Sequence, residues 1–185
     1  ISYMTAGESH GKGLIGIIEG IPAGMNITEE YIEKDLLRRM QGHGRGGRMK
    51  IEKDHAEIFS GVRHAITLGS PISLLIKNFD WVNWEDRMAT GKPKKEHRKV
   101  TMPRPGHADL AGVMKYGLDD IRNVLERSSA RETAMRVAIG AVCRKLLEEV
   151  GITVGSRVYQ IHNIVDDTPV SNNMSLKELN DTVDA

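Results

Sequence analysis

The sequence predicts an α+β fold, in which helices pack on an antiparallel sheet. Short apolar runs between glycines or prolines, at 14–18 and within 56–77, are typical of strands. Two longer segments, 28–40 and 130–150, carry apolar residues every three or four positions, as amphipathic helices do. The 185 residues are 39% hydrophobic and 28% charged, which is a globular composition with enough apolar mass for a core.

The first elements are two predicted strands and a helix. Residues 3–6 are expected to form a short strand. The apolar run Leu14–Ile18, closed by Gly20, is expected to be a strand that is buried on both faces. Thr28 is the predicted N-cap of the helix that follows, because glutamates occupy the first turn, and Gly42 ends the apolar pattern of that helix.

The middle of the chain is expected to form strands and then a loop. Residues 57–60, 62–67 and 71–76 are predicted strands, arranged most economically as an antiparallel meander. The polar segment 78–105 is predicted to be a long surface loop. Its mixed-charge run 92–99 could contact an anionic ligand or nucleic acid, although such runs are most often solvated excursions.

The last third contains the clearest helix, 130–150, which Gly151 ends. Residues 152–165 are expected to be a long strand or a hairpin. Ser175 and Glu178 fit the capping box of a last, shorter helix. We expect the whole chain to be one domain.

Charge and cysteine content restrict the function. With 26 basic and 25 acidic residues, the net charge of +1 argues against a general polyanion binder, so an anion site must come from local clustering. Cys143 is the single cysteine, which excludes an internal disulfide framework, and we expect it to be a core residue and not a nucleophile. No run has the length of a membrane span or a secretory signal, and we expect a cytoplasmic protein.

The segment Gly7–Gly11 is the strongest candidate for a functional turn. It places His10 between glycines after a strand, where a ligand can approach the main chain closely and the imidazole is presented to it. A turn in which Ser9 bonds the backbone and His10 only faces water is equally compatible. Gly11–Gly16 also matches the G-x-G-x-x-G dinucleotide fingerprint, but no helix opens there, so we interpret the match as chance.

The loop Gly42–Arg48 is a second candidate. It contains four glycines and two arginines and directly follows a helix that ends in Arg38 and Arg39. Its amides and guanidinium groups can surround phosphate or carboxylate oxygens. A flexible loop in solvent is the alternative.

Two further turns carry similar groups. In Glu126–Thr133, Ser129 and Glu132 fit a capping box, and serines flanked by arginines at the positive end of a long helix also describe a phosphate cradle. In Pro103–Asp109, prolines and a glycine frame His107 at or just before a helix start.

Together, two framed histidines and the arginines of three turns describe a site for a small, multiply anionic ligand. A histidine titrates near neutrality and can give a proton to a leaving phosphate, while arginines hold the other charges. The sequence shows no metal-ligand spacing, no nucleophile elbow and no carboxylate pair of obvious geometry.

These segments closely resemble those of chorismate synthases. The resemblance is colinear to about residue 165 and rests on four segments: Gly7–Gly11 with its continuation to Pro22, Gln41–Arg48, Arg104–Asp109 and Glu126–Thr133. It implies a carbon–oxygen lyase of aromatic amino acid biosynthesis in the shikimate pathway. Such an enzyme forms chorismate by 1,4-elimination of phosphate from 5-enolpyruvylshikimate 3-phosphate, and it needs reduced FMN.

The resemblance also implies roles for single residues. His10 resembles the acid that protonates the leaving phosphate, and His107 resembles a histidine next to the reduced flavin. Residues that resemble substrate-binding groups are Ser9, Arg39, Arg45, Arg48 and Arg131. Residues that resemble FMN-binding groups are Arg104, Arg127, Ser128 and Ser129. Arg39 and Arg45 are also implied in binding NADPH, and no metal ligand is implied.

The implied fold is a β-α-β sandwich of two similar halves that assembles as a homotetramer. Members of this family are roughly twice as long as this chain, so the resemblance implies an N-terminal half with an incomplete flavin pocket. We expect this half to be inactive alone and to expose an apolar patch at its missing neighbour. An external flavin reductase is an implied partner where the enzyme does not reduce its own flavin.

A module that binds RNA or another polyanion, through the 42–48 loop and the 92–99 run, is the alternative function. It predicts steeply salt-dependent binding without preference for flavin. The balanced charge and the 4% aromatic content argue against it, since single-strand binding uses aromatic stacking platforms. We therefore expect a small anionic substrate as the partner, and neither nucleic acid nor a membrane.

Overall fold

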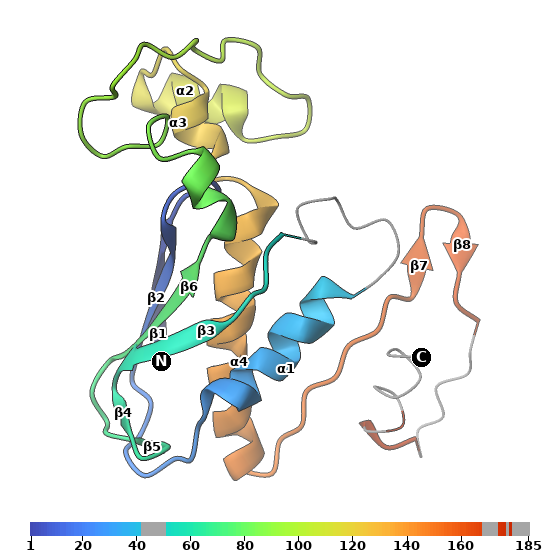
Figure 1. Ribbon diagram of the computed structural model, residues 1–185. Helices are drawn as coiled ribbons and strands as arrows, with labels where there is room; N and C mark the ends of the chain where they lie inside the picture. The colour runs from blue at the N-terminus through green and yellow to red at the C-terminus, as the bar shows by residue number, and fades with distance from the viewer. Residues whose placement is uncertain (42–50, 168–173, 177, 179–185) are drawn as a thin grey trace. The chain divides into compact units, whose positions relative to one another are not determined.

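The computed structural model describes residues 1–41, 51–167, 174–176 and 178 (Figure 1). The chain forms two compact units, Ile1–Val142 and Cys143–Ala185. The predicted Gly42–Arg48 loop, with Arg45 and Arg48, lies outside the described residues. Among the described residues, no helix has both the length and the apolar composition that crossing a membrane requires.

The first unit is built on a four-stranded antiparallel sheet in the order β1-β2-β6-β3. Its strands are β1 Ser2–Gly7, β2 Gly13–Glu19, β3 Ala56–Ser60 and β6 Ile72–Lys77. β1 and β2 form a hairpin, and the predicted functional segment Gly7–Gly11 is its tip. Gly7 has φ +109°, and a Cβ there would lie 2.3 Å from the Gly13 carbonyl oxygen, so this position requires glycine.

Helices pack on one face of this sheet. Thr28 caps α1 (Glu29–Met40) by accepting a hydrogen bond of 3.2 Å from the Tyr31 amide, which confirms the predicted N-cap. The long helix α4 (Thr133–Glu149) begins in the first unit, where it lies against the sheet (Figure 1). A Cβ on Gly16 would lie 2.6 Å from Met135 Sδ, so α4 packs directly on β2.

The other face of the sheet is apolar and exposed. Met4 pairs with Ile17, and Ile15 pairs with Leu75, so these four side chains share this face. Met4 is 72% exposed, Ile15 46% and Ile17 44%. The prediction that Leu14–Ile18 is buried on both faces is therefore wrong, because α4 covers only the face that carries Leu14 and Ile18. An exposed apolar patch is thus present, as expected.

The predicted meander is also wrong. β4 (Val62–Arg63) and β5 (Ile66–Thr67) form a separate hairpin, and β3 pairs with β6. The hydrogen bonds of Thr67 explain why β5 does not join the four-stranded sheet. Its amide donates to the Met25 carbonyl at 2.9 Å, and its hydroxyl donates to the Pro22 carbonyl at 2.6 Å, so β5 is tied to the segment before α1.

The described part of the first unit also contains three short helices. They are η2 Phe79–Asn83, α2 Asp109–Tyr116 and α3 Arg122–Leu125, and a turn of 3-10 helix, η3 Ala130–Glu132, leads into α4. Within 78–105, η2 is the helical part, and irregular chain follows it. His107 lies two residues before α2, as predicted.

The second unit contains the end of α4 and a small hairpin of β7 (Gln160–Ile161) and β8 (Ile164–Val165). The predicted strand or hairpin at 152–165 is thus a short hairpin. The capping box is confirmed: the Ser175 amide donates to Glu178 Oε2 at 2.7 Å, and the Glu178 amide donates to Ser175 Oγ at 3.2 Å. Cys143 is half-buried, so the prediction that it is a core residue is wrong, because this position of α4 is only partly covered. Burial still raises the pKa of its thiol, which disfavours the reactive thiolate.

Candidate functional site

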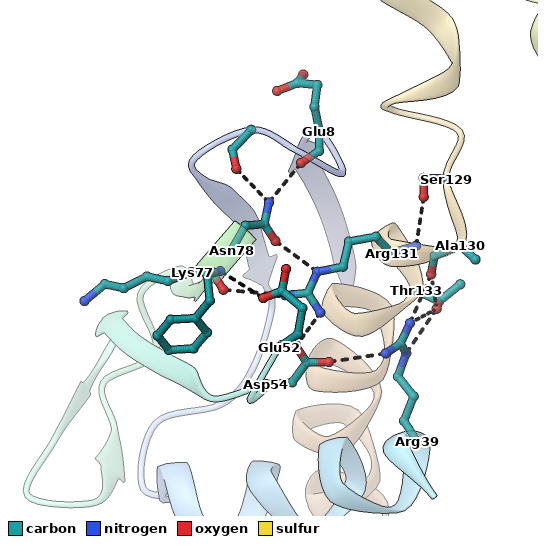
Figure 2. A network of polar contacts seen from close by, with 12 residues as sticks. Glu8, Arg39, Glu52, Asp54, Lys77, Asn78, Ser129, Ala130, Arg131 and Thr133 are labelled. Carbon is teal, nitrogen blue, oxygen red and sulfur yellow. Dashed lines mark hydrogen bonds and ion pairs between the residues drawn. The ribbon is translucent and has the colours of Figure 1, made fainter. Parts of the chain in front are cut away.

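Asn78 fixes the hairpin tip that carries His10. Its side-chain amide donates to the carbonyl of Glu8 at 3.0 Å and to that of Gly11 at 2.8 Å (Figure 2). Its own backbone N–H donates to the Lys12 carbonyl at 3.2 Å. Asn78 directly follows β6, the strand beside β2. The tip is therefore held by the sheet that produces it, and His10 has a defined position.

Arg131 joins Asn78 to a buried cluster of carboxylates. Its Nε donates to Asn78 Oδ1 at 2.9 Å, and its guanidinium group also bonds Asp54 and lies 3.5 Å from Glu52 Oε2 (Figure 2). Arg131 is only 6% exposed. A buried guanidinium ion needs such partners, because an unpaired charge in the interior is costly.

Arg39 reaches the same cluster from α1. Its Nη1 donates to Asp54 at 3.2 Å, and its Nη2 donates to the Ala130 carbonyl at 3.1 Å and to Thr133 Oγ1 at 2.9 Å (Figure 2). Asp54 thus links Arg39 to Arg131. The structure therefore brings together two of the arginines that are predicted to bind substrate, and each of them bonds other residues of the protein. Their contact with a ligand stays a prediction.

His10 is held by Glu126, which directly follows α3. Glu126 Oε2 accepts a hydrogen bond of 3.0 Å from the His10 amide and lies 2.7 Å from His10 Nδ1. The Glu126 carbonyl also accepts from the amide of the buried Ser9 at 2.9 Å. The interpretation in which His10 only faces water is therefore wrong, since its ring has a fixed carboxylate partner and is 22% exposed.

Trp84 supports the His10 ring from one side. The two rings stack with centroids 4.0 Å apart, and Trp84 Nε1 donates to Asp80 Oδ2 at 3.0 Å. That same oxygen lies 3.8 Å from His10 Nε2. The guanidinium groups of Arg87 and Arg122 lie 5.2 Å and 5.1 Å from the Trp84 centroid, within the range of cation–π attraction.

A basic hollow lies beside this stack. It has a volume of about 400 Å³ and is lined by Arg87, Arg98, Lys99 and Arg122, together with Val100, Thr101 and Met102. Four cationic side chains around one hollow favour an anionic ligand. Two of these four side chains, Arg87 and Arg122, also contact Trp84, so the hollow adjoins the residues that hold His10.

His107 has a carboxylate partner of its own. Its Nδ1 lies 2.5 Å from Asp109 Oδ1, and Arg104 Nε donates to Asp109 Oδ2 at 2.9 Å. Asp109 is fully buried. The hydrogen bond from the Arg104 side chain is the main cause that lowers the pKa of Asp109 to about 2, with a further contribution from His107. Asp109 is thus ionised and orients both predicted site residues of this turn.

The predicted FMN-binding triplet lies next to the hairpin. Arg127 Nη2 donates to the Thr5 carbonyl at 2.9 Å, and Ser128 Oγ donates to the Val124 carbonyl at 2.9 Å. Ser129 caps η3, because its hydroxyl accepts a hydrogen bond of 3.3 Å from the Arg131 amide. Ser128 is exposed and Arg127 is partly exposed, so both can reach a ligand.

The predicted capping box of Ser129 and Glu132 is wrong. The Glu132 carboxylate turns to other partners: its Oε1 accepts from Thr5 Oγ1 at 2.7 Å, and its Oε2 accepts from Arg136 Nε at 2.7 Å. The physical reason is that β1 offers Glu132 a hydroxyl partner. Ser129 therefore begins η3, and α4 begins at Thr133.

No local sequence pattern indicates most of the partners that position the predicted residues. These partners are Asp54, Asn78, Asp80, Trp84, Arg122 and Glu126. Glu126 lies within a segment that is predicted to be functional, but its partner His10 lies 116 positions away, and no local pattern connects them. Among the described residues, no group of three or more His, Cys, Asp or Glu side chains could hold a metal ion.

Comparison with known proteins decides the family. The model of the chorismate synthase family matches residues 1–185. The chain belongs to the chorismate synthase family. It is 60% identical over 162 residues to the chorismate synthase of Aquifex aeolicus, and 55% identical over 185 residues to that of Syntrophomonas wolfei. The predicted resemblance is therefore confirmed.

A solved structure supports the same family assignment. A crystal structure described as that of chorismate synthase matches 90% of the chain with a TM-score of 0.67 and 46% sequence identity. The predicted α+β fold class is confirmed. The chain spans less than half the length of these relatives, since it covers 41% and 47% of the two sequences and 40% of the solved chain.

Proposed function

We propose that the protein carrying this chain is a chorismate synthase, a lyase that converts 5-enolpyruvylshikimate 3-phosphate into chorismate by 1,4-elimination of phosphate. The observation that carries the proposal is the family match over all 185 residues. The site agrees with it, because a positioned histidine adjoins a hollow lined by cations, as a substrate with a phosphate and two carboxylates requires.

His10 acts as the acid in this proposal. The C–O bond to the phosphate breaks, its electron pair leaves with the phosphate oxygen, and that oxygen takes a proton from His10. The ring proton of the substrate is removed in the same overall elimination, so the reaction loses one phosphate and forms one carbon–carbon double bond. Glu126 and Trp84 hold His10 in position for the transfer.

The residues of two turns fit an anionic cofactor such as FMN. Ser128 is exposed and the guanidinium group of Arg127 is partly exposed where the chain enters η3 and α4. The Ser128 hydroxyl donates to the Val124 carbonyl, so the guanidinium group supplies the donors that suit a phosphate group. Arg104, half-exposed, and His107 would adjoin the flavin. When bound, reduced FMN supplies an electron transiently and takes part in removing the ring proton.

The remaining assignments are part of the same proposal. Ser9, Arg39, Arg45, Arg48 and Arg131 would surround the substrate, and Arg39 and Arg45 would also contact NADPH where it serves as reductant. For Arg39 and Arg131 we propose mainly a supporting role, since both bond Asp54. We further propose a cytoplasmic homotetramer, with an external flavin reductase where the enzyme does not reduce FMN itself.

The test is product formation by the full-length protein. Incubated without oxygen with 5-enolpyruvylshikimate 3-phosphate and reduced FMN, it should release phosphate and form chorismate in equal amounts. Oxidised FMN without a reductant is the control and should give neither product. Absence of chorismate with reduced FMN, in a protein that is folded, would overturn the proposal.

A further inference from the structure

Glu126 accepts two hydrogen bonds from one residue through one oxygen. Its Oε2 lies 3.0 Å from the His10 amide nitrogen and 2.7 Å from His10 Nδ1. Burial alone raises the pKa of Glu126, but the hydrogen bonds from His10 and Arg122 and the charge of His10 outweigh it, so the pKa is lowered. An ionised carboxylate can only accept hydrogen bonds, so the proton in the short contact belongs to Nδ1.

The Glu126 carboxylate is itself fixed. Its other oxygen, Oε1, accepts a hydrogen bond of 2.9 Å from Arg122 Nη1, and the side chain is 1% exposed. Its main-chain carbonyl holds the Ser9 amide. Trp84 stacks on the imidazole, so the ring cannot rotate without losing both the stack and the bond to Glu126.

The second ring nitrogen has a different environment. His10 Nε2 faces Asp80 Oδ2 at 3.8 Å, which is longer than a hydrogen bond. The guanidinium groups of Arg87 and Arg122 lie against Trp84, the ring that stacks on His10. Because Nδ1 is committed to Glu126, Nε2 is the nitrogen at which a proton can be gained or lost.

We propose that Glu126 is the positioning residue of His10: it holds the ring so that Nδ1 keeps its proton and Nε2 exchanges one with the ligand. An imidazolium ring that gives its Nε2 proton to a phosphate oxygen becomes the neutral Nδ1–H tautomer. Glu126 stabilises that tautomer. The proton transfer to a phosphate oxygen rests on the proposed function, whereas the assignment of the tautomer does not.

The tautomer can be measured in the full-length protein labelled with ¹⁵N-histidine. The ring signals of His10 are assigned by their loss in His10→Asn. In the wild type, the neutral ring should show a protonated Nδ1 and an unprotonated Nε2. In Glu126→Ala the signals should shift toward the Nε2–H tautomer, and kcat should fall about 10- to 100-fold with KM little changed, by analogy with the carboxylate partners of metal-binding histidines.

Glu126→Gln keeps the test decisive where the alanine variant does not fold. Its amide oxygen can still accept from Nδ1, so the tautomer should persist and part of kcat should return, while the Nδ1–H proton resonance moves upfield because the bond to a neutral acceptor is weaker. The matched control is Glu29→Gln, whose carboxylate lies 3.1 Å from His55 Nε2. It should change the signals of His55 and leave those of His10 unaltered.

Two results would overturn the inference: a neutral Nε2–H tautomer of His10 in the wild type, or ring signals in both Glu126 variants that match those of the wild type. Failure of the proposed function would look different. In that case the wild type would form no chorismate, while the ring signals of His10 would still change when Glu126 is substituted.

Discussion

Gly112 of α2 packs against Val124 of α3 without room for another atom. A Cβ on Gly112 would lie 2.3 Å from Val124 Cγ1. The contact matters for the site because α2 follows the turn of His107 and α3 leads into Glu126, the partner of His10. Because Gly112 has no Cβ, α2 and α3 can lie in direct contact. The two histidine–carboxylate pairs, His107 with Asp109 and His10 with Glu126, are therefore attached to helices that touch.

Gly112→Ala should therefore destabilise the protein despite the better helix propensity of alanine. Overpacking costs about 1–3 kcal/mol, and the propensity gain offsets about 1 kcal/mol or less. Urea denaturation measures the free energy of unfolding. The control is Gly140→Ala in α4, where a Cβ would meet nothing within 4 Å, and stability should rise by about 0.5–1 kcal/mol. Equal effects of the two substitutions would contradict the packing argument.

Asp54→Asn should weaken the polar network that links α1 to the start of α4. Asp54 bonds both Arg39 and Arg131, and its side chain is almost fully buried. Removing its charge leaves Arg131 with Glu52 as its ionic partner, so we expect a loss of about 3 kcal/mol, the low end for a broken buried ion pair. Denaturant unfolding tests this.

Asp119→Asn is the matched control for that substitution. Asp119 also pairs with a cation, Lys99, but its side chain is 77% exposed. Solvent screens such a pair, so its loss should leave the unfolding midpoint unchanged. A similar loss of stability in both variants would show that burial of the Asp54 pair has no special effect.

Asp109 should make stability depend on acid pH. Its pKa is lowered from 3.8 to about 2 in the folded protein, so the folded state binds this proton more weakly than the unfolded chain does. The stabilisation is therefore complete above about pH 5 and is lost as the pH falls toward about 2.

The comparison of wild type with Asp109→Asn isolates this effect, because the other carboxylates are common to both. The difference in their free energies of unfolding should be constant above about pH 5 and should shrink between about pH 4 and pH 2. A difference that does not change over this range would contradict the role assigned to Asp109. Circular dichroism in denaturant at each pH gives the measurement.

Local patterns predict the elements well where the local chain decides the structure. Thr28 caps α1 through its own first turn, and Gly7 supplies the positive φ with which the hairpin tip begins. The burial of Leu14–Ile18 is not predictable in the same way, because a continuous apolar run does not show how many faces a helix covers. The placement of β5 is not predictable either, because Thr67 takes partners more than 40 residues away.

The residues of the site also divide into those that local patterns indicate and those that depend on distant partners. The sequence indicates His10, His107 and the arginine turns, because glycine and proline frame them. It cannot indicate that Glu126 binds His10 or that Asp54 binds Arg131, since these partners are 116 and 77 residues apart and meet only after the sheet has formed. A short-range signal exists for Asp109, which lies two residues from His107.

Turnover by His10→Ala in the full-length protein tests the acid role of His10 most directly, measured as chorismate formed per enzyme with saturating substrate and reduced FMN. General acid catalysis contributes about 100- to 10,000-fold, so kcat should fall by a factor in this range. Absorbance titration should show that FMN still binds. A kcat close to that of the wild type would contradict the assignment of His10 as the acid.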